Sequence, residues 1–165
     1  MIPFLDLTPG EDGADVRAAM DRVIERGWFV LGPEVEAFER EFASACGASH
    51  AVGVGTGTDA IALALRACGI GPGDEVITAP LSAAYSALAI MMAGARPVFA
   101  DIDPDRLTLD PRAADAAVTM KTRAILPVHL YGQPADMPEI AAVAARHRLL
   151  VIEDCCQAHM ATCDG

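Results

Sequence analysis

The sequence predicts an α/β fold built on a mostly parallel sheet with helices on both faces. From residue 50 onward, short apolar runs alternate with longer segments of helical period, which is typical of βα units. The short runs are apolar throughout rather than at every second position, as expected for strands buried on both faces. Hydrophobic residues make up 53% of the 165 residues but aromatic ones only 5%, so the core must consist mainly of small aliphatic side chains. Such cores suit closely packed layers of helix on sheet.

The expected elements follow one another along the chain. Two helices come first, one over residues 11–26 and a second that begins at Pro33 and is closed by Gly47. The apolar connector between them, residues 28–31, is either a packing contact between the helices or a contact with a second subunit or the substrate. We expect one domain over residues 1–165, with helices over 1–48 and the α/β part over 49–165. Expected strands cover residues 50–54, 75–79, 97–101, 124–129 and 149–153, and expected helices between them cover 59–68, 82–92, 111–118 and 137–147.

Charge and composition argue against several kinds of partner. The formal net charge of -11, from 12 basic and 23 acidic side chains, would repel a nucleic acid. The first residues lack the basic region and apolar core of a signal peptide, and the longest uncharged run, residues 79–95, is shorter than the span of about 20 apolar residues that a membrane needs. The cysteines are odd in number, 5, and form no CxxC pair, which favours reduced thiols. We therefore expect a cytoplasmic protein that binds neither nucleic acid nor a membrane.

The carboxyl ends of the strands are where a sheet of this kind binds its ligands. Four segments of the chain follow directly after expected strands and so meet at that edge. They are residues 55–59, 80–85, 129–133 and 154–159.

A glycine turn occupies the first of these segments. Gly55 and Gly57 allow the backbone to approach a ligand closely, and the next residues open a helix whose free N–H groups suit a phosphate. The alternative is a plain turn from strand to helix. The turn also matches the dinucleotide pattern GxGxxA, which requires an acidic residue at the end of the second strand. Glu75 has the spacing but begins that strand, so the sequence does not favour NAD.

An aspartate ends the last expected strand. Asp154 follows an apolar run and emerges at the carboxyl edge of the sheet. A carboxylate there can hold a pyridine nitrogen protonated, which makes the ring an electron sink. Alone, such an aspartate could equally cap a helix. Together with the phosphate turn, it favours a cofactor that carries both a phosphate and a pyridine ring.

Four segments of the sequence resemble the DegT/StrS family of nucleotide-sugar aminotransferases. The similarity follows the family's order through the whole chain. The segments are Gly-Pro-Glu-Val-Glu-Ala-Phe-Glu-Arg-Glu-Phe (32–42), Gly-Thr-Asp-Ala-Ile-Ala-Leu-Ala-Leu-Arg (57–66), Pro-Val-His-Leu-Tyr-Gly-Gln-Pro-Ala-Asp (127–136) and Val-Ile-Glu-Asp-x-x-Gln-Ala-His (151–159).

This resemblance implies the large domain of a fold-type-I enzyme that uses pyridoxal 5'-phosphate. It implies that Gly57, Thr58 and Asp59 contact the cofactor phosphate, chiefly through backbone N–H groups. By the same resemblance, Asp154 pairs with the pyridinium nitrogen and Gln157 donates to the phenolic oxygen of the ring.

Other residues of the family pattern differ here or have alternative roles. Ala83 stands where the family commonly has an aromatic residue that stacks on the ring, and we expect Tyr85 to take that role. His129 and Tyr131 either line the substrate cavity or cap the sheet, and His159 is a further candidate for substrate contact. We expect no metal site. The run 101–105 imitates a calcium loop but lacks its glycine, and a structural zinc would need Cys155, Cys156, His159 and Cys163 together on a single loop.

Lysine occurs only once, at Lys121, just before the fourth expected strand and therefore at the amino edge of the sheet. The family's Schiff-base lysine follows the Glu-Asp pair by a few tens of residues. We therefore expect that the 165 residues end before this lysine. On their own they are expected to be poorly stable and to have no catalytic activity.

The resemblance predicts an aminotransferase that moves an amino group from an amino-acid donor to a keto group on a nucleotide-linked sugar. The intact enzyme is expected to be a homodimer. The alternatives are a non-catalytic remnant that binds a phosphorylated ligand and a sugar dehydratase of the same family.

Overall fold

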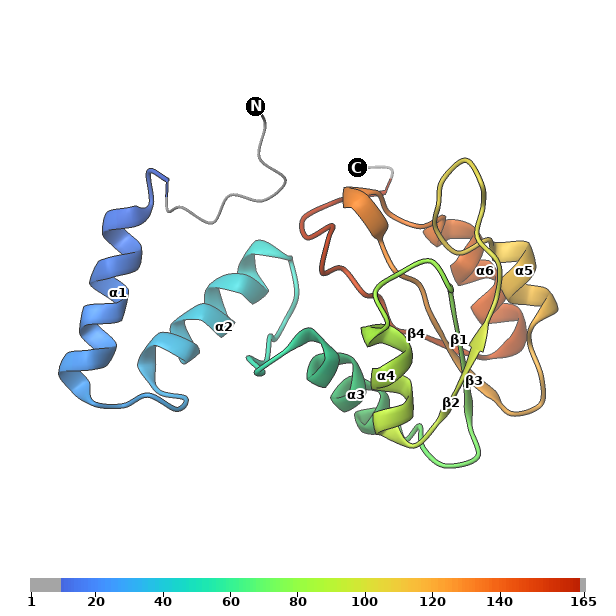
Figure 1. Cartoon of the computed structure of the whole chain (residues 1–165), viewed down its shortest axis with the longest axis horizontal. Helices are drawn as coiled ribbons and strands as arrows, with labels where there is room; N and C mark the ends of the chain where they lie inside the picture. The colour runs from blue at the N-terminus through green and yellow to red at the C-terminus, as the bar shows by residue number, and fades with distance from the viewer. Residues whose placement is uncertain (1–9, 164–165) are drawn as a thin grey trace. The chain divides into compact units, whose positions relative to one another are not determined.

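The computed structural model describes residues 10–163, which divide into two compact units (Figure 1). The first unit extends to Gly53 and the second begins at Val54. Each unit is described by itself below.

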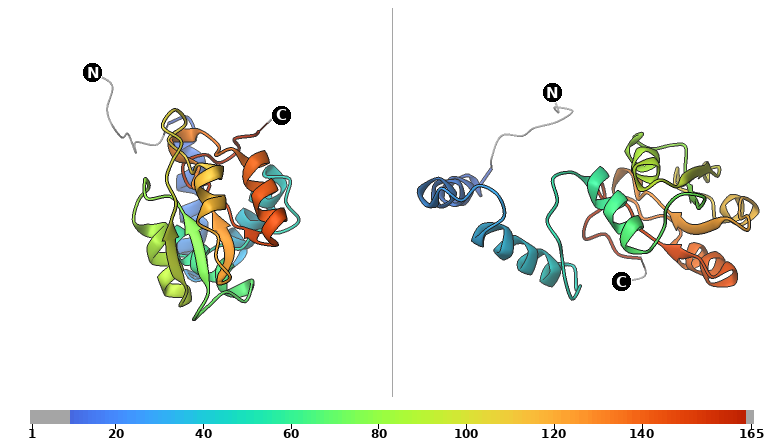
Figure 2. Two further views of the ribbon diagram at one scale, coloured as in Figure 1. Left: turned by 90° about the vertical axis from the view of Figure 1, so that its right-hand side faces the viewer. Right: turned by 90° about the horizontal axis from the view of Figure 1, so that it is seen from below.

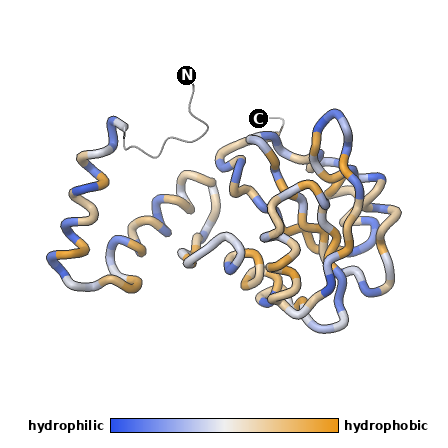
Figure 3. The backbone as a smooth tube through the Cα atoms, viewed as in Figure 1, coloured by the Kyte–Doolittle hydropathy of each residue, from blue (hydrophilic) through white to orange (hydrophobic). Residues whose placement is uncertain are grey.

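The N-terminal unit contains two amphipathic helices, α1 (Gly13–Arg26) and α2 (Pro33–Ala45), as the sequence predicts. Apolar and polar positions alternate along both of them (Figure 3). An ion pair between Arg22 and Glu34 joins the helices, with Nε and Oε1 2.9 Å apart. The apolar side chains of α1 remain largely exposed, 59% for Met20 and 63% for Ile24, so this unit encloses almost no core of its own.

The strand expected over residues 50–54 is absent, and this prediction was wrong. The segment has no regular secondary structure, and it is anchored where the Gly53 N–H donates to Glu39 Oε1 at 2.7 Å. A strand exists only where a neighbour supplies ladder hydrogen bonds, and no described segment pairs with this one. The apolar sequence of this segment is suited to a strand, but the segment has no neighbouring strand to pair with among the described residues.

The second unit is built on a sheet of four strands in the order β2-β1-β3-β4, and every pairing is parallel. At the centre, Ile77 lies beside Val98 on one side and beside Ile125 on the other. This confirms the predicted parallel sheet. The strands are β1 (Glu75–Thr78), β2 (Arg96–Phe99), β3 (Thr122–Leu126) and β4 (Leu150–Val151).

Helices cover both faces of this sheet (Figure 2). Val76 and Leu126 point to the face covered by α3 and α4, whereas Ile77 and Ile125 point to the face covered by α5 and α6. Two apolar clusters result, one on each side, which confirms the predicted α/β fold with helices on both faces. The helices are α3 (Gly57–Ala67), α4 (Tyr85–Ala93), α5 (Pro111–Ala116) and α6 (Met137–His147), with a short 3-10 turn η1 (Leu130–Gly132).

The amino edge of the sheet carries a buried charged group. Glu75 accepts a hydrogen bond from Thr119 Oγ1 at 2.6 Å and an ion pair from Arg96. The Thr119 hydroxyl and then Arg96 lower the pKa of Glu75 below its usual value. Lys121 lies at this same edge, because its carbonyl accepts the Glu75 N–H. Within residues 10–163, none of the helices combines the length and the apolar character needed to cross a bilayer.

Candidate functional site

A cavity of about 460 Å³ opens at the carboxyl edge of the sheet in the second unit. It collects residues from the start of α3, the start of α4, the end of β3 and the segment after β4. The described residues that line it are Thr56, Gly57, Thr58, Ile61, Ser82, Ala83, Tyr85, Ser86, Val128, Asp154, Cys156 and Gln157.

The N-terminus of α3 provides one wall of the cavity. Thr56 caps the helix, since its Oγ1 accepts the Asp59 N–H at 3.1 Å and donates to Asp59 Oδ2 at 2.8 Å. The Asp59 N–H, which we expected to contact a phosphate, is thus engaged in the cap. The N–H groups of Gly57 and Thr58 have no partner among the described residues, as is usual for the first turn of a helix. Two donors at the positive end of the helix therefore face the cavity, an arrangement that suits an anion.

Asp154 forms another part of the cavity wall. Its backbone continues the β3–β4 ladder, because Asp154 N donates to Pro127 O and His129 N donates to Asp154 O, both at 3.0 Å. The side chain is buried, with 9% of the residue exposed. Ser86 Oγ donates to Oδ2 at 3.1 Å, and the Cys156 N–H donates to Oδ1 at 3.2 Å. The wall of the cavity therefore contains both a fixed carboxylate and the N–H donors at the start of α3.

Cys156 lies beside both Asp154 and the start of α3. Its thiol is hydrogen-bonded to the Asp154 carboxylate, and this bond, followed by burial, raises the pKa of the Cys156 thiol to about 11. The thiol is therefore protonated at neutral pH and acts as a donor to Asp154. A Cβ atom at position 57 would lie 3.1 Å from the Cys156 sulfur, closer than an ordinary contact. Glycine at position 57 thus allows the sulfur to sit against the start of α3.

Gln157 is oriented by a backbone donor. The N–H of Tyr131 donates to Gln157 Oε1 at 3.0 Å. Tyr131 has φ 57 and ψ 29, in the left-handed region that residues other than glycine seldom adopt. Because the carbonyl end of the Gln157 amide is engaged, its NH₂ end is left to donate to an acceptor on a ligand.

His129 is 3% exposed and holds the loop after β3. Its Nδ1 accepts the Ala135 N–H at 3.1 Å, so the proton of the neutral ring lies on Nε2, which donates to Glu153 Oε2 at 2.9 Å. His129, Glu153 and Cys155 lie close enough together to hold a metal ion. A metal on Nε2 would leave this ring with no proton at all while Nδ1 still accepts, which argues against a metal there.

The predicted site residues fall into two groups. Gly57, Thr58, Tyr85, Asp154 and Gln157 line the cavity, and Tyr85 does so from the first turn of α4 with 62% of its surface exposed. The other four predicted residues do not line the cavity. Asp59 belongs to the cap of α3, and the substrate candidates His129 and Tyr131 lie in the loop after β3. The third substrate candidate, His159, lies in the segment after β4, where its Nδ1 is 3.1 Å from Cys155 O.

Sequence reasoning missed two residues that shape the site, Thr56 and Ser86, and it did not predict the contact of Cys156 with Asp154. Thr56 carried a local signal, since a threonine before a helix with an acidic residue three positions on is a capping pattern. Ser86 carried none, because its partner lies 68 residues further along the chain.

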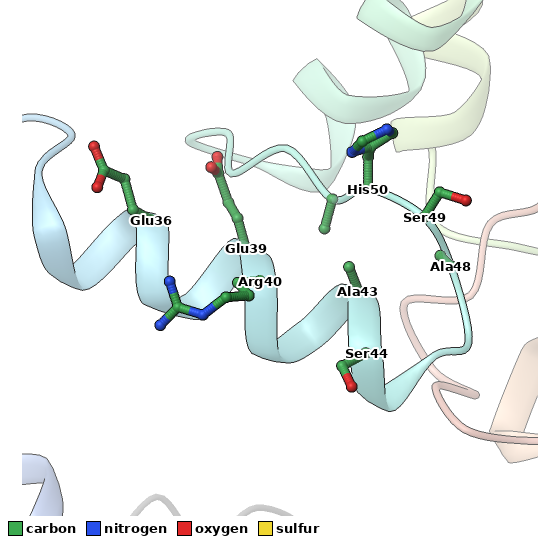
Figure 4. Close-up of a pocket in the computed structure, with 9 residues that line it drawn as sticks. Glu36, Glu39, Arg40, Ala43, Ser44, Ala48, Ser49 and His50 are labelled. Carbon is green, nitrogen blue, oxygen red and sulfur yellow. The ribbon is translucent and has the colours of Figure 1, made fainter.

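The N-terminal unit has a hollow of its own, about 560 Å³, between α2 and residues 48–51 (Figure 4). Glu39 and His50 point to one side of α2 and Arg40 points to the other, so these side chains do not converge. The Glu39 carboxylate is already engaged with the Gly53 N–H. This hollow therefore offers no constellation of reactive groups.

A parallel sheet covered by helices on both faces, with a helix N-terminus and a buried carboxylate lining one cavity at its carboxyl edge, is an arrangement typical of α/β proteins that bind a ligand at that edge. Residues 11–165 match the model of the DegT/DnrJ/EryC1/StrS aminotransferase family, and the chain belongs to that family. The resemblance on which the sequence predictions depended is thereby confirmed.

Individual relatives agree with this assignment. The chain is 50% identical over 166 residues to a dTDP-3-amino-3,4,6-trideoxy-alpha-D-glucose transaminase of Streptomyces venezuelae, covering 99% of this chain and 44% of the relative. It is 47% identical over 167 residues to a dTDP-3-amino-3,6-dideoxy-alpha-D-galactopyranose transaminase of Aneurinibacillus thermoaerophilus, covering 100% of this chain and 46% of the relative. The chain thus spans less than half the length of these curated relatives.

Solved structures show the same fold. The S. venezuelae DesV structure in complex with a ketimine intermediate superposes with a TM-score of 0.92 at 51% identity, over 96% of this chain and 43% of DesV. The structure of NtdA from Bacillus subtilis with bound cofactor PMP gives a TM-score of 0.92 at 36% identity, over 98% of this chain and 38% of NtdA.

Proposed function

We propose that this chain supplies the cofactor-binding part of an aminotransferase that uses pyridoxal 5'-phosphate and acts on keto-sugars linked to a nucleotide. The observation that carries the proposal is the shared cavity, whose wall contains both the N–H donors of Gly57 and Thr58 and the buried carboxylate of Asp154. A phosphate and a protonated ring nitrogen on one small molecule require this pairing of opposite charges.

The residues present fit that cofactor. The N–H groups of Gly57 and Thr58 would bind the phosphate without a cation, through the positive end of α3. Asp154 would accept a hydrogen bond from the ring nitrogen, and the free NH₂ end of Gln157 would donate to the phenolic oxygen. When bound, the cofactor supplies an electron-withdrawing ring that allows an amino group to move between an amine and a keto carbon.

Tyr85 is proposed to cover one face of the ring. It projects from the first turn of α4 into the cavity wall and is exposed enough to change rotamer when a planar ligand enters. An aromatic side chain over a ring contributes about 0.5–1.5 kcal/mol beyond the apolar area that it buries.

An amine that could bond covalently to the cofactor is not among the residues that line the cavity. Lys121 is the single lysine of the 165 residues, and it lies at the opposite edge of the sheet beside Glu75. We therefore propose that these residues bind the cofactor reversibly and do not catalyse transamination by themselves. After incubation with pyridoxal 5'-phosphate and borohydride reduction, mass spectrometry should find no peptide from the cavity that carries the cofactor.

The substrate assignment is supported by the names of the relatives, which act on dTDP-linked amino sugars. We propose a nucleotide-linked keto-sugar as amino acceptor, an amino acid as donor and a homodimer for the whole protein. The shared family and the identities of 50% and 47% to these two relatives support the class of substrate.

Binding of pyridoxamine 5'-phosphate tests the proposal directly, because that form of the cofactor needs no covalent attachment. We expect saturable binding by isothermal titration calorimetry. Asp154→Asn should weaken it by about tenfold or more, since hydrogen bonds to charged groups are worth about 1.5–3 kcal/mol. Asp105→Asn, on an exposed loop outside the cavity, is the matched control and should leave affinity unchanged. Absence of binding, or equal affinity in Asp154→Asn, would contradict the proposal, and tight competing binding of NAD would revive the dinucleotide alternative.

A further inference from the structure

We propose that Ser86 is a positioning residue that aims the Asp154 carboxylate at the ring nitrogen of the bound cofactor. The inference rests on the proposed function and extends it to a residue in α4 that no sequence motif marks.

The backbone of Asp154 is fixed, but its side chain needs a separate constraint. Two ladder hydrogen bonds to Pro127 and His129 hold the main chain and leave the carboxylate free to rotate about its own bonds. Ser86 Oγ engages Oδ2 at 3.1 Å, and the Cys156 N–H engages Oδ1 at 3.2 Å. Together with the Cys156 thiol, these groups hold the carboxylate from two different elements, and this fixes the plane of the group.

The Ser86 hydroxyl is placed for this task rather than for helix capping. Serine in the first turn of a helix usually bonds to nearby backbone groups, whereas this hydroxyl reaches a partner 68 residues away. Ser86 is only 2% exposed, yet it belongs to the wall of the cavity. A buried donor that reaches the carboxylate beside the ligand space controls the direction in which the remaining lone pairs point.

Direction matters because a hydrogen bond weakens steeply when donor and acceptor are misaligned. A carboxylate that can rotate spends part of its time turned away from the ring. The resulting loss of affinity affects only ligands whose ring carries an N–H. A ligand with a carbon at that place makes no such bond and should be insensitive to the orientation of Asp154.

The test therefore compares pyridoxamine 5'-phosphate with its 1-deaza analogue, in which carbon replaces the ring nitrogen. The unaltered chain should prefer the nitrogen-containing ligand, and Ser86→Ala should reduce that preference by about fivefold to tenfold. Ser86→Thr keeps the hydroxyl and should restore most of the preference. With a ¹⁵N-labelled ring, NMR should show the bound nitrogen losing its proton at lower pH in Ser86→Ala than in the unaltered chain.

Two controls separate positioning from a general structural effect. Thr78→Val removes another buried hydroxyl, bonded to Leu126 O at 2.9 Å, and should lower stability without changing the ligand preference. Ser86→Ala introduced into an Asp154→Ala background should cause no further loss of preference, because the two residues act as a unit.

The outcomes distinguish the two proposals. Equal losses for both ligands in Ser86→Ala, or an unchanged preference, would overturn the positioning role and leave the proposed function intact. Failure of the unaltered chain to bind either ligand would overturn both. A preference that falls in Ser86→Ala, returns in Ser86→Thr and is lost in Asp154→Ala would support both.

Discussion

The second unit of this chain buries its apolar side chains, whereas the N-terminal unit leaves most of its large ones exposed. The second unit closes two layers of helices over a four-stranded sheet, and side chains such as Leu65, Ile77 and Ile125 have no exposed surface. The N-terminal unit is comparably apolar along one face of α1 but leaves Ile24 and Phe29 63% and 69% exposed. The difference teaches that an amphipathic pattern is enough to predict a helix. A core also requires a second layer of secondary structure against which the apolar face of the helix packs.

The largest expected effect tests that difference in core formation. Ile125→Ala removes a fully buried side chain of β3, one of the two inner strands of the sheet, and should lower the free energy of unfolding by about 2–5 kcal/mol. Ile24→Ala, at an exposed position of α1, should change it by no more than about 0.5 kcal/mol. Urea unfolding followed by circular dichroism provides the measurement. Similar losses for the two variants would mean that α1 has a buried partner in solution.

A second effect concerns the tight contact at the start of α3. Gly57→Ala would place a Cβ atom 3.1 Å from the sulfur of Cys156, an exposed side chain that can shift by a few tenths of an ångström, and should destabilise the second unit by no more than about 1 kcal/mol. Gly55→Ala is the control, because its Cβ would meet nothing closer than 3.9 Å. Combining Gly57→Ala with Cys156→Ala should restore the melting temperature. If the double variant is no more stable than Gly57→Ala, the sulfur is not the cause of the strain.

Local patterns predicted most of this fold because most of it is encoded locally. The helix over residues 137–147 was predicted to the residue, since Asp136 supplies its cap, Pro138 suits its first turn and apolar positions recur at helical spacing. The strand predicted over residues 50–54 is absent because a strand needs a neighbouring strand to pair with, and no described segment pairs with this one. The expected helix at 82–92 begins instead at Tyr85, after a turn that the apolar pattern does not mark.

The same limit applies to the site. The glycine turn and Asp154 were predictable because the carboxyl edge of a parallel sheet brings strand ends together whatever lies between them. The hydroxyl of Ser86 and the thiol of Cys156 reach Asp154 only through the three-dimensional packing of α4 and the last segment. Even the Asp59 N–H, assigned to a phosphate by resemblance, is engaged by a threonine three residues earlier.

Helix capping gives a third, smaller contrast between the units. Asp110 caps α5 by accepting the Arg112 N–H at 2.8 Å, and Asp110→Ala should cost about 1 kcal/mol. Asp12 holds the equivalent position at α1 but makes no side-chain cap bond, so Asp12→Ala should change stability by a few tenths of a kcal/mol at most. Thermal unfolding of the two variants measures the contrast, and a larger loss for Asp12→Ala would contradict it.

The smallest contrast is in the response to acid and salt. The Thr119 hydroxyl and Arg96 lower the pKa of Glu75, and Arg22 lowers the pKa of Glu34. A carboxylate whose pKa is lower in the folded state adds stability above its unfolded pKa, and that stability is lost as pH falls through the folded value. Both Glu75→Gln and Glu34→Gln should therefore make the free energy of unfolding fall less steeply on acidification from about pH 5 downward.

Salt should separate the two carboxylates. The Glu75 side chain is only 4% exposed whereas that of Glu34 is 29% exposed, so added salt should remove the contribution of Glu34 and leave most of that of Glu75. The free energy of unfolding of both variants is measured by urea denaturation at a series of pH values, in low salt and in 1 M salt. Equal salt sensitivity of the two variants would show that Glu75 is solvated in solution.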